Sequence, residues 1–264
     1  MIEVKNLLKN FELSKKQQKE RNTSEMTTCA VNDISFECLP GRIFSLLGPN
    51  GAGKTTTLRM LATILQPSSG TIQVCGLDSV SDAQEVRKKI GMLFQGGALF
   101  DSLTLEENVR FPLDMFTKMT NEEKLERVNF CLEKVQLTNK NNLYPSELSG
   151  GMKKRAALAR AIANNPKYLF CDEPNSGLDP KTSIIIDNLI QSLTQEFNIT
   201  TIVITHDMNS VVEIGQNILY VYKGKHWWTG NSQDILKTTN PELVDFVFAS
   251  GFMKEVFNAV KKKQ

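Results

Sequence analysis

The sequence predicts an α/β fold with a mixed core sheet, an antiparallel β lobe beside it and a separate α-helical lobe. Apolar, strand-like segments alternate with helical segments over most of the chain, which is typical of a parallel sheet covered by helices. The first two strand-like segments have no helix between them, which indicates the antiparallel lobe. The middle of the chain, from about 105 to 135, is helical apart from one break, which indicates the third lobe.

The strands are predicted from alternation, from Val, Ile and Phe content and from short apolar runs. Residues 2–8 and 30–37 show the alternation. Residues 42–47 (RIFSLL) form an apolar run that ends at a glycine, as a buried strand does. Further strands are expected at 71–75, 92–94, 167–174 and 201–207, followed by a hairpin at 223–230.

The helices are predicted from apolar spacing and from helix propensity. Residues Leu125, Val128, Leu132 and Val135 share one helix face. The Ala-rich segment 152–164 favours helix by composition. The expected helices are 53–64, 82–90, 105–135 with a break near 120–121, 152–164, 184–197 and one or two amphipathic helices in 241–260. We therefore divide the chain into residues 1–240, with a helical lobe at about 96–163, and a C-terminal helical tail at 241–264.

The segment between the first two strands, 13–28, is polar and lacks apolar periodicity. A solvated loop is one interpretation, and a basic patch that contacts lipid headgroups or nucleotide is the other.

Composition excludes several classes of function. The 264 residues carry 31 basic and 29 acidic side chains, so the formal net charge of +2 gives no electrostatic basis for nucleic-acid binding. No apolar run is long enough for a transmembrane helix, so a separate subunit would have to cross any membrane. The five cysteines are scattered without a C-x-x-C pair, which favours a reducing cytoplasm.

The segment GPNGAGKT has the spacing of a phosphate-binding P-loop, between a predicted buried strand and a predicted helix. Glycines allow backbone N–H groups to point at phosphate oxygens, and the helix N-terminus adds partial positive charge. Lys54 is expected to reach the β- and γ-phosphates, and the hydroxyl of Thr55 to bind Mg²⁺. A glycine-rich turn is the alternative. The expected ATP-binding residues of this segment are Gly48, Pro49, Asn50, Gly51, Ala52, Gly53, Lys54, Thr55 and Thr56.

Two adjacent carboxylates, Asp172 and Glu173, end the apolar run that precedes them. Carboxylates at the end of a buried strand are costly unless they serve a cation or a reaction. Asp172 suits the Mg²⁺ site, and Glu173 suits the polarisation of an attacking water. A structural helix cap at Asp172 is the alternative.

The segment LSGGM precedes the Ala-rich helix and consists of Leu148, Ser149, Gly150, Gly151 and Met152. Ser149 is a helix N-cap on sequence grounds alone. Ser-Gly-Gly at a helix start is also an anion site, and one helix start already serves the phosphates. This second site therefore suggests closure on the nucleotide of another molecule.

GPNGAGKTT, Gln95, LSGGM, LFCDEP, SGLDP and ITHD occur in the order and spacing of ATP-binding-cassette (ABC) ATPases, and the chain resembles that family over residues 1 to about 240. The resemblance implies a P-loop NTPase of the ABC type that uses ATP and Mg²⁺. It implies that Gln95 contacts Mg²⁺, that His206 contacts the γ-phosphate and that Phe11 lies against adenine. A histidine that ends an apolar strand is, taken alone, more often structural. The resemblance also implies a D-loop at the dimer interface, formed by Ser176, Gly177, Leu178 and Asp179. The pair Asn175-Ser176 departs from the commoner Thr-Ser at this place.

The subfamily resemblance is divided. Residues 1–94 resemble the sodium-exporter type of ATPase, whereas residues 91–258 resemble the ATPase of MCE-type phospholipid transporters. The chain therefore resembles a mosaic with a seam near 90–95.

The resemblance implies an ATPase subunit on the cytoplasmic face of the membrane, working as a homodimer or paired cassette with an integral permease. We expect phospholipid transport. A sodium or drug exporter, a non-transport ABC ATPase and a nucleotide-dependent regulator are the alternatives. Six apolar residues of the stretch 95–145 either line a groove for the permease or all belong to the core: Leu99, Phe100, Leu103, Phe111, Leu113 and Phe116.

Overall fold

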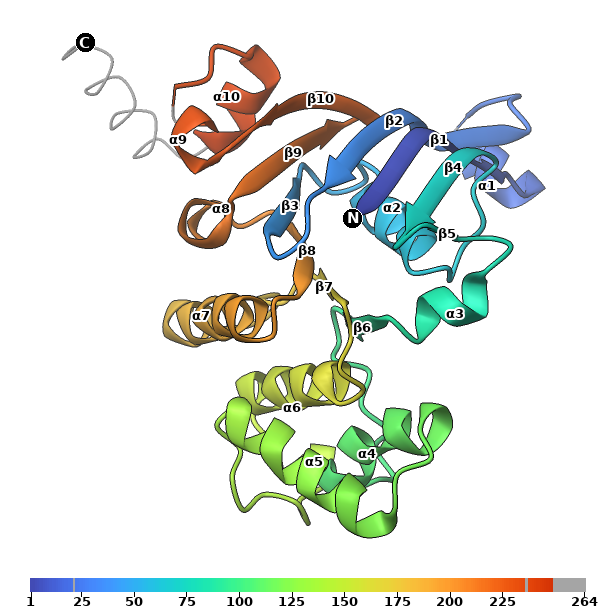
Figure 1. Cartoon of the computed structure of the whole chain (residues 1–264). Helices are drawn as coiled ribbons and strands as arrows, with labels where there is room; N and C mark the ends of the chain where they lie inside the picture. The colour runs from blue at the N-terminus through green and yellow to red at the C-terminus, as the bar shows by residue number, and fades with distance from the viewer. Residues whose placement is uncertain (21, 236, 249–264) are drawn as a thin grey trace, which may run out of the picture.

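The centre of the fold is a six-stranded sheet, seen in a computed structural model that describes residues 1–20, 22–235 and 237–248 (Figure 1). In spatial order its strands are β10 (Lys225–Gly230), β9 (Asn217–Tyr222), β3 (Ile43–Leu47), β8 (Thr200–Thr205), β7 (Tyr168–Asp172) and β6 (Ile90–Leu93). Strands β3, β7 and β8 are buried at every residue, as expected for parallel strands covered on both faces. β10 runs antiparallel to β9, so the predicted mixed sheet is confirmed.

The antiparallel lobe is a second sheet whose spatial order is β2 (Thr27–Cys38), β1 (Ile2–Glu12), β4 (Ser69–Val74) and β5 (Leu77–Asp78). Helix α2 (Lys54–Leu61) lies between this sheet and the central one (Figure 1). Leu7, Leu58, Phe170 and Ile202 belong to one buried cluster that joins the two sheets through α2. Burial on this face fixes the start of α2, and with it the P-loop, against the central sheet.

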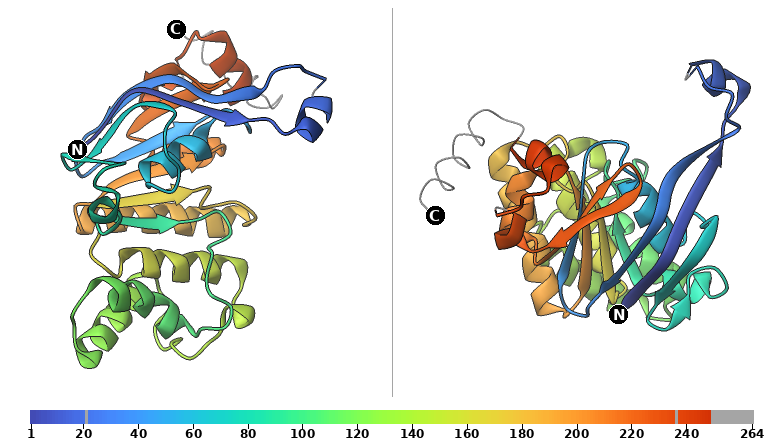
Figure 2. Two further views of the ribbon diagram at one scale, coloured as in Figure 1. Left: turned by 90° about the vertical axis from the view of Figure 1, so that its right-hand side faces the viewer. Right: turned by 90° about the horizontal axis from the view of Figure 1, so that it is seen from above.

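The first two strands extend further than the predicted 2–8 and 30–37, and the intervening segment is not only a loop. Cross-strand pairing continues to Phe11↔Thr28 and Glu12↔Thr27. The tip contains a short helix, α1 (Lys15–Glu20), which has no buried residue. Alternation fails as a signal here because both faces of this ribbon meet solvent and need no apolar residues. Figure 2 shows the hairpin projecting beyond the edge of the central sheet where the parallel strands end.

The opposite face of the central sheet is covered by helices. The buried cluster on this side includes Leu93, Leu158, Ile186 and Val203. The helices that contribute to it are α4 (Leu105–Phe116), α5 (Asn121–Lys134), α6 (Gly150–Ile162) and α7 (Pro180–Glu196). Helices α4, α5 and α6 form the predicted helical lobe below the sheet (Figure 1).

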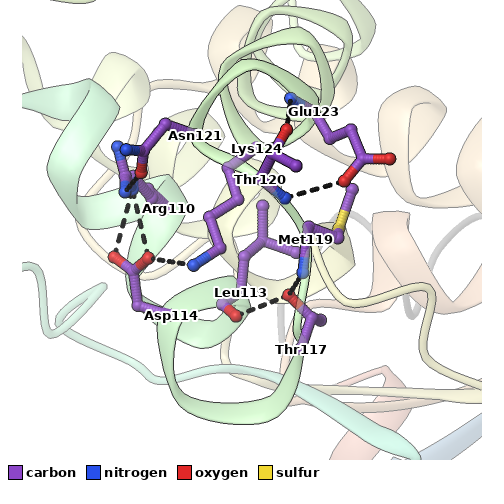
Figure 3. Close-up of polar contacts among 9 residues, drawn as sticks. All are labelled: Arg110, Leu113, Asp114, Thr117, Met119, Thr120, Asn121, Glu123 and Lys124. Atoms are coloured by element: carbon purple, nitrogen blue, oxygen red, sulfur yellow. Dashed lines mark hydrogen bonds and ion pairs between the residues drawn. The ribbon is translucent and has the colours of Figure 1, made fainter.

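The predicted break near 120–121 is the turn between α4 and α5 (Figure 3). Thr120 and Glu123 form a capping box that starts α5. The carboxylate of Asp114 accepts bonds from Arg110 Nε at 3.1 Å and Lys124 Nζ at 2.7 Å, so both helices are tied to one side chain. Each pair is half-exposed and contributes on the order of 0.5 kcal/mol, so the corner depends mainly on the helix caps and the buried face of α5.

Two further predicted helices are wrong in length, and the structure adds some short ones. The helix expected at 53–64 ends at Leu61, and the one expected at 82–90 is only α3 (Ala83–Arg87), because Ile90 already belongs to β6. Three short helices pack beside β9 and β10: α8 (Met208–Ile214), α9 (Ser232–Ile235) and α10 (Pro241–Val247). The rest of the predicted tail, from 249 on, lies outside the described residues, and the division at residue 240 stays a prediction. Among the residues that the structure describes, every helix is too short or too polar to span a membrane.

Candidate nucleotide-binding and hydrolysis site

The P-loop connects β3 to α2, and its glycines are required by close backbone contacts. A Cβ atom at Gly48 would lie 2.2 Å from the carbonyl oxygen of Val221, and one at Gly53 would lie 2.4 Å from that of Ala30. Gly53 also has a φ of 101°, in the region that favours glycine. The predicted loop is therefore a turn lined by backbone at the start of a helix, which suits an anion.

Lys54 is directed into this loop. Its side chain is only 4% exposed, and its Nζ donates to the carbonyl oxygens of Gly48 at 2.7 Å and Pro49 at 3.0 Å. Burial lowers the pKa of Lys54, while the nearby charges of Glu173 and Asp172 raise it. The ammonium group thus lies among the atoms that the sequence assigns to phosphate binding.

Thr55, the residue after Lys54, contacts Asp172 at the end of β7. The Thr55 hydroxyl donates to Asp172 Oδ1 at 3.1 Å, and Asp172 is buried. Burial raises the pKa of Asp172, and the bond from Thr55 lowers it. A hydroxyl and a carboxylate are oxygen ligands of the kind that Mg²⁺ prefers, so these residues fit that cation. The described residues contain no cluster of three or more His, Cys, Asp or Glu suited to a metal.

The three remaining predicted catalytic residues converge at the ends of adjacent parallel strands. Gln95 Nε2 donates to Glu173 Oε2 at 2.9 Å, and His206 Nδ1 lies 3.2 Å from Glu173 Oε1. They follow β6, β7 and β8, which are neighbours in the sheet, and ligands commonly bind at this edge of such sheets. Glu173 has a φ of 47°, an uncommon value for a residue with a side chain and one associated with functional sites.

The LSGGM segment and the D-loop lie side by side at the starts of α6 and α7. Ser149 caps α6 by accepting the N–H of Met152, and Asp179 caps α7 by accepting those of Lys181 and Thr182. A Cβ at Gly151 would lie 2.5 Å from Thr182 Cγ2, so this glycine permits close packing of the two helix starts. Both segments have the geometry of helix caps, and their roles toward a second molecule stay predictions.

Lys154 belongs to the site but was not predicted from the sequence. Its side chain is 5% exposed and reaches from α6 to the carbonyl oxygens of Gln95 and Glu173. Burial lowers its pKa, and the neighbouring charges of Asp172 and Glu173 raise it. The available signal was its place on the helix face shared with Ala157, Leu158 and Ala161, where a lysine needs a reason to be buried.

Phe11 lies on β1 opposite Thr28 and is 37% exposed, with the Lys9 ammonium group 5.3 Å from its ring centre. The adjacent strand β2 contacts the P-loop, because the Ala30 carbonyl abuts Gly53. This places the aromatic ring on a strand pair that borders the phosphate site. Contact with adenine stays a prediction.

Residues 31–176 match the family model described as "ABC transporter", and the chain belongs to that family. The matched region contains the P-loop, Gln95, LSGGM and the two carboxylates. The site is therefore that of an ABC ATPase, and the predicted family and fold class are confirmed.

The curated relatives and solved structures agree with this assignment. The chain is 39% identical over 233 residues to "Methionine import ATP-binding protein MetN 2" of Bacillus cereus, covering 87% of this chain and 67% of the relative. It is 39% identical to "Methionine import ATP-binding protein MetN" of Desulfitobacterium hafniense, covering 85% of this chain and 64% of that protein. A dimeric post-hydrolysis state of the ATP-binding cassette MJ0796 bound to ADP and Pi aligns with a TM-score of 0.78 and 31% identity over 88% of this chain and 99% of that one.

Lys54→Ala should weaken ATP binding by about 100-fold or more, because a charge-assisted contact to phosphate is lost. Fluorescent-nucleotide titration measures this effect. Lys153→Ala, a change of a lysine outside the P-loop, is the control and should leave affinity unchanged. Near-normal affinity in Lys54→Ala would contradict the assignment of the loop.

Glu173→Gln should retain nucleotide binding and lower kcat by about 10²-fold or more, since the amide keeps the shape but cannot accept a proton from water. Steady-state phosphate release and nucleotide titration on the same sample separate the two effects. Turnover close to that of the wild type would assign the hydrolytic role to another residue.

Proposed function

We propose that two copies of this chain enclose two Mg·ATP and drive a separate integral membrane permease from the cytoplasmic face of the membrane. The single observation that carries the hydrolytic part is the convergence of Gln95, Glu173 and His206 beside the Thr55–Asp172 pair. Steady-state ATP hydrolysis, abolished in Glu173→Gln, is the direct test.

The proposed mechanism assigns each residue a task that its position allows. Backbone N–H groups of the P-loop and the Lys54 ammonium bind the phosphates. Mg²⁺, when bound at Thr55 and Asp172, neutralises phosphate charge. Glu173 orients the attacking water and accepts its proton, while Gln95 and His206 hold the Glu173 carboxylate from both sides.

The dimer is supported by the placement of LSGGM and by the solved relatives. Ser149 begins a helix of the helical lobe, whereas the P-loop belongs to the core sheet, and we infer that a second copy supplies the LSGGM segment to each nucleotide. "Dimeric Structure of MJ0796, a Bacterial ABC Transporter Cassette" aligns with a TM-score of 0.78. We infer that Ser149 and Gly151 contact the γ-phosphate of the partner's nucleotide and that the D-loop lies at the interface.

The permease is proposed to bind in a groove of about 500 Å³ between α4, β6 and α6. Phe100, Phe111 and Phe116 line it and are 38% to 42% exposed, with the rings of Phe100 and Phe111 4.8 Å apart. Leu113 is buried in the core and Leu99 packs against it, so five of the six predicted apolar residues divide between core and groove, while the half-buried Leu103 belongs to neither. Exposed aromatic side chains in a concave surface suit an apolar helix of a partner.

The predicted transport of phospholipid receives no support from the relatives, whose names describe methionine import. The lipid proposal rests on the resemblance of residues 91–258 alone. Purification from membranes with the bound permease would decide the question. An MCE-associated permease would support the lipid proposal, and an amino-acid or sodium-exporter permease would contradict it.

The two alternatives of different class are a non-transport ABC ATPase and a nucleotide-dependent regulator. The presence of both Glu173 and His206 at the site favours turnover over regulation. The apolar groove favours a membrane partner over a non-transport role.

Mixing two inactive variants tests the shared site. Ser149→Arg should block closure by its bulk, and Lys54→Ala should remove ATP binding, so neither variant should hydrolyse ATP alone. A mixed dimer has one intact P-loop opposite one intact LSGGM segment, and random pairing restores about a quarter of the wild-type sites. Phosphate release measured after mixing gives the result. A mixture no more active than its components would contradict two independently working shared sites.

Phe100→Ala and Phe111→Ala should reduce recovery of the permease by about tenfold, because aromatic anchors carry much of the energy of such interfaces. ATP hydrolysis by the isolated chain should remain unchanged. Leu125→Ala removes a side chain on α5 that is 40% exposed and lies outside the groove, so it serves as the matched control. Equal recovery with all three variants would place the permease elsewhere.

A further inference from the structure

Asp187 is a buried carboxylate on α7 that the mechanism above does not use. It is 2% exposed, and none of the ion pairs found among the described residues includes it. Burial raises its pKa, and the nearby charges of Asp207 and Glu213 raise it further. A carboxylate in such surroundings destabilises the fold unless hydrogen bonds compensate.

Two polar side chains supply those bonds. Asn175 Nδ2 donates to Asp187 Oδ1 at 2.9 Å and to Ser210 Oγ at 2.8 Å. Hydrogen bonding by Ser210 and Asn175 lowers the pKa of Asp187 against the effect of burial. An amide group has two N–H donors, so Asn175 bonds to both partners at once.

These three residues connect the segments that carry the hydrolytic side chains. Asn175 follows Glu173 by two residues, and Ser210 follows His206 by four in the first turns of α8. Glu173 Oε1 and His206 Nδ1 are themselves 3.2 Å apart. The contacts and the two chain segments therefore form a closed ring. Asp187 lies two turns into α7, whose N-cap is the D-loop residue Asp179.

Most of these residues border a cavity of about 640 Å³ between the D-loop, α7 and α8. Glu173, Asn175, Asp187 and His206 all line it. These four residues therefore border open space and are not enclosed by core side chains on every side.

We propose that Asp187 is a positioning residue for ATP hydrolysis, which sets the separation of the Glu173 and His206 segments through Asn175 and Ser210. The inference rests on the proposed hydrolytic function of Glu173. Loss of Asp187 leaves Asn175 and Ser210 without their common acceptor, so the two segments can move apart. Nucleotide binding is unaffected because Lys54 and Thr55 have separate partners at Gly48, Pro49 and Asp172.

The variants Asp187→Leu, Asn175→Leu and Ser210→Ala test this role in steady-state ATP hydrolysis. Each should lower kcat, by about tenfold for the first two, with KM for ATP within about twofold of the wild type. Asp187→Asn should recover part of kcat, because its amide oxygen still accepts from Asn175 and Ser210.

Thr194→Val is the matched control on the same helix. Thr194 is 2% exposed and bonds to the Ile190 carbonyl at 2.7 Å and Thr201 Oγ1 at 2.6 Å, away from the site. It should lower Tm without changing kcat. A lower Tm with unchanged kcat in Asp187→Leu would overturn the inference. A fall in kcat in Asp187→Leu that is not smaller in Asp187→Asn would overturn it as well.

If Asp187→Leu does not fold, Asn175→Leu, Ser210→Ala and Asp187→Asn decide the question by the same criteria. If the wild type hydrolyses ATP and the variants have the same kcat, this inference is overturned but the proposed function stands. A wild type that does not hydrolyse ATP would overturn the proposed function, and this inference with it.

Discussion

The site depends on a balance of buried charge at the end of β7. Asp172 and Glu173 lie where a fully buried strand leaves the sheet, and two buried lysines approach from different helices. Lys54 comes from α2 and Lys154 from α6, and the charges of both carboxylates raise the pKa of each lysine against the effect of burial. Buried ions are tolerated when hydrogen bonds and nearby opposite charges compensate them, so these four groups stabilise one another without direct ion pairs.

The groups in this balance come from α2, α6 and the end of β7, and these three parts of the fold meet at one edge of the central sheet. The lysines donate to backbone carbonyl oxygens, Lys54 within the P-loop and Lys154 at Gln95 and Glu173. Among the residues that the structure describes, neither lysine forms an ion pair with a carboxylate, so both carboxylates remain available to a cation and a water. The glycines at 48 and 53 then allow the backbone to approach closely enough for this arrangement.

Much of this was accessible from the sequence, and the misses have physical causes. The buried parallel strands β3 and β7 are almost entirely apolar, so their ends and the segments that follow them, which carry Lys54, Asp172 and Glu173, were predictable. The hairpin tip at 13–28 was misjudged because an exposed ribbon needs no apolar alternation. Lys154 and Asp187 were missed because their roles come from residues distant in the chain. A polar residue at a core position of a helix was the available signal in both cases.

The groove and the hydrolytic residues are joined mechanically through α6. Arg160 of this helix donates to the carbonyl oxygens of Gly97 and Ala98, and Lys154 donates to that of Gln95. The segment 95–98 is thus held to α6 at both ends, while Ala98, Phe100 and Arg160 line the groove. A shift of α6 relative to the core sheet would carry Gln95 with it and change its 2.9 Å contact with Glu173. Occupancy of the groove and the geometry of the proposed hydrolytic site therefore depend on the position of one helix, so a partner bound at the groove would be coupled to turnover as the two sites of an allosteric protein are.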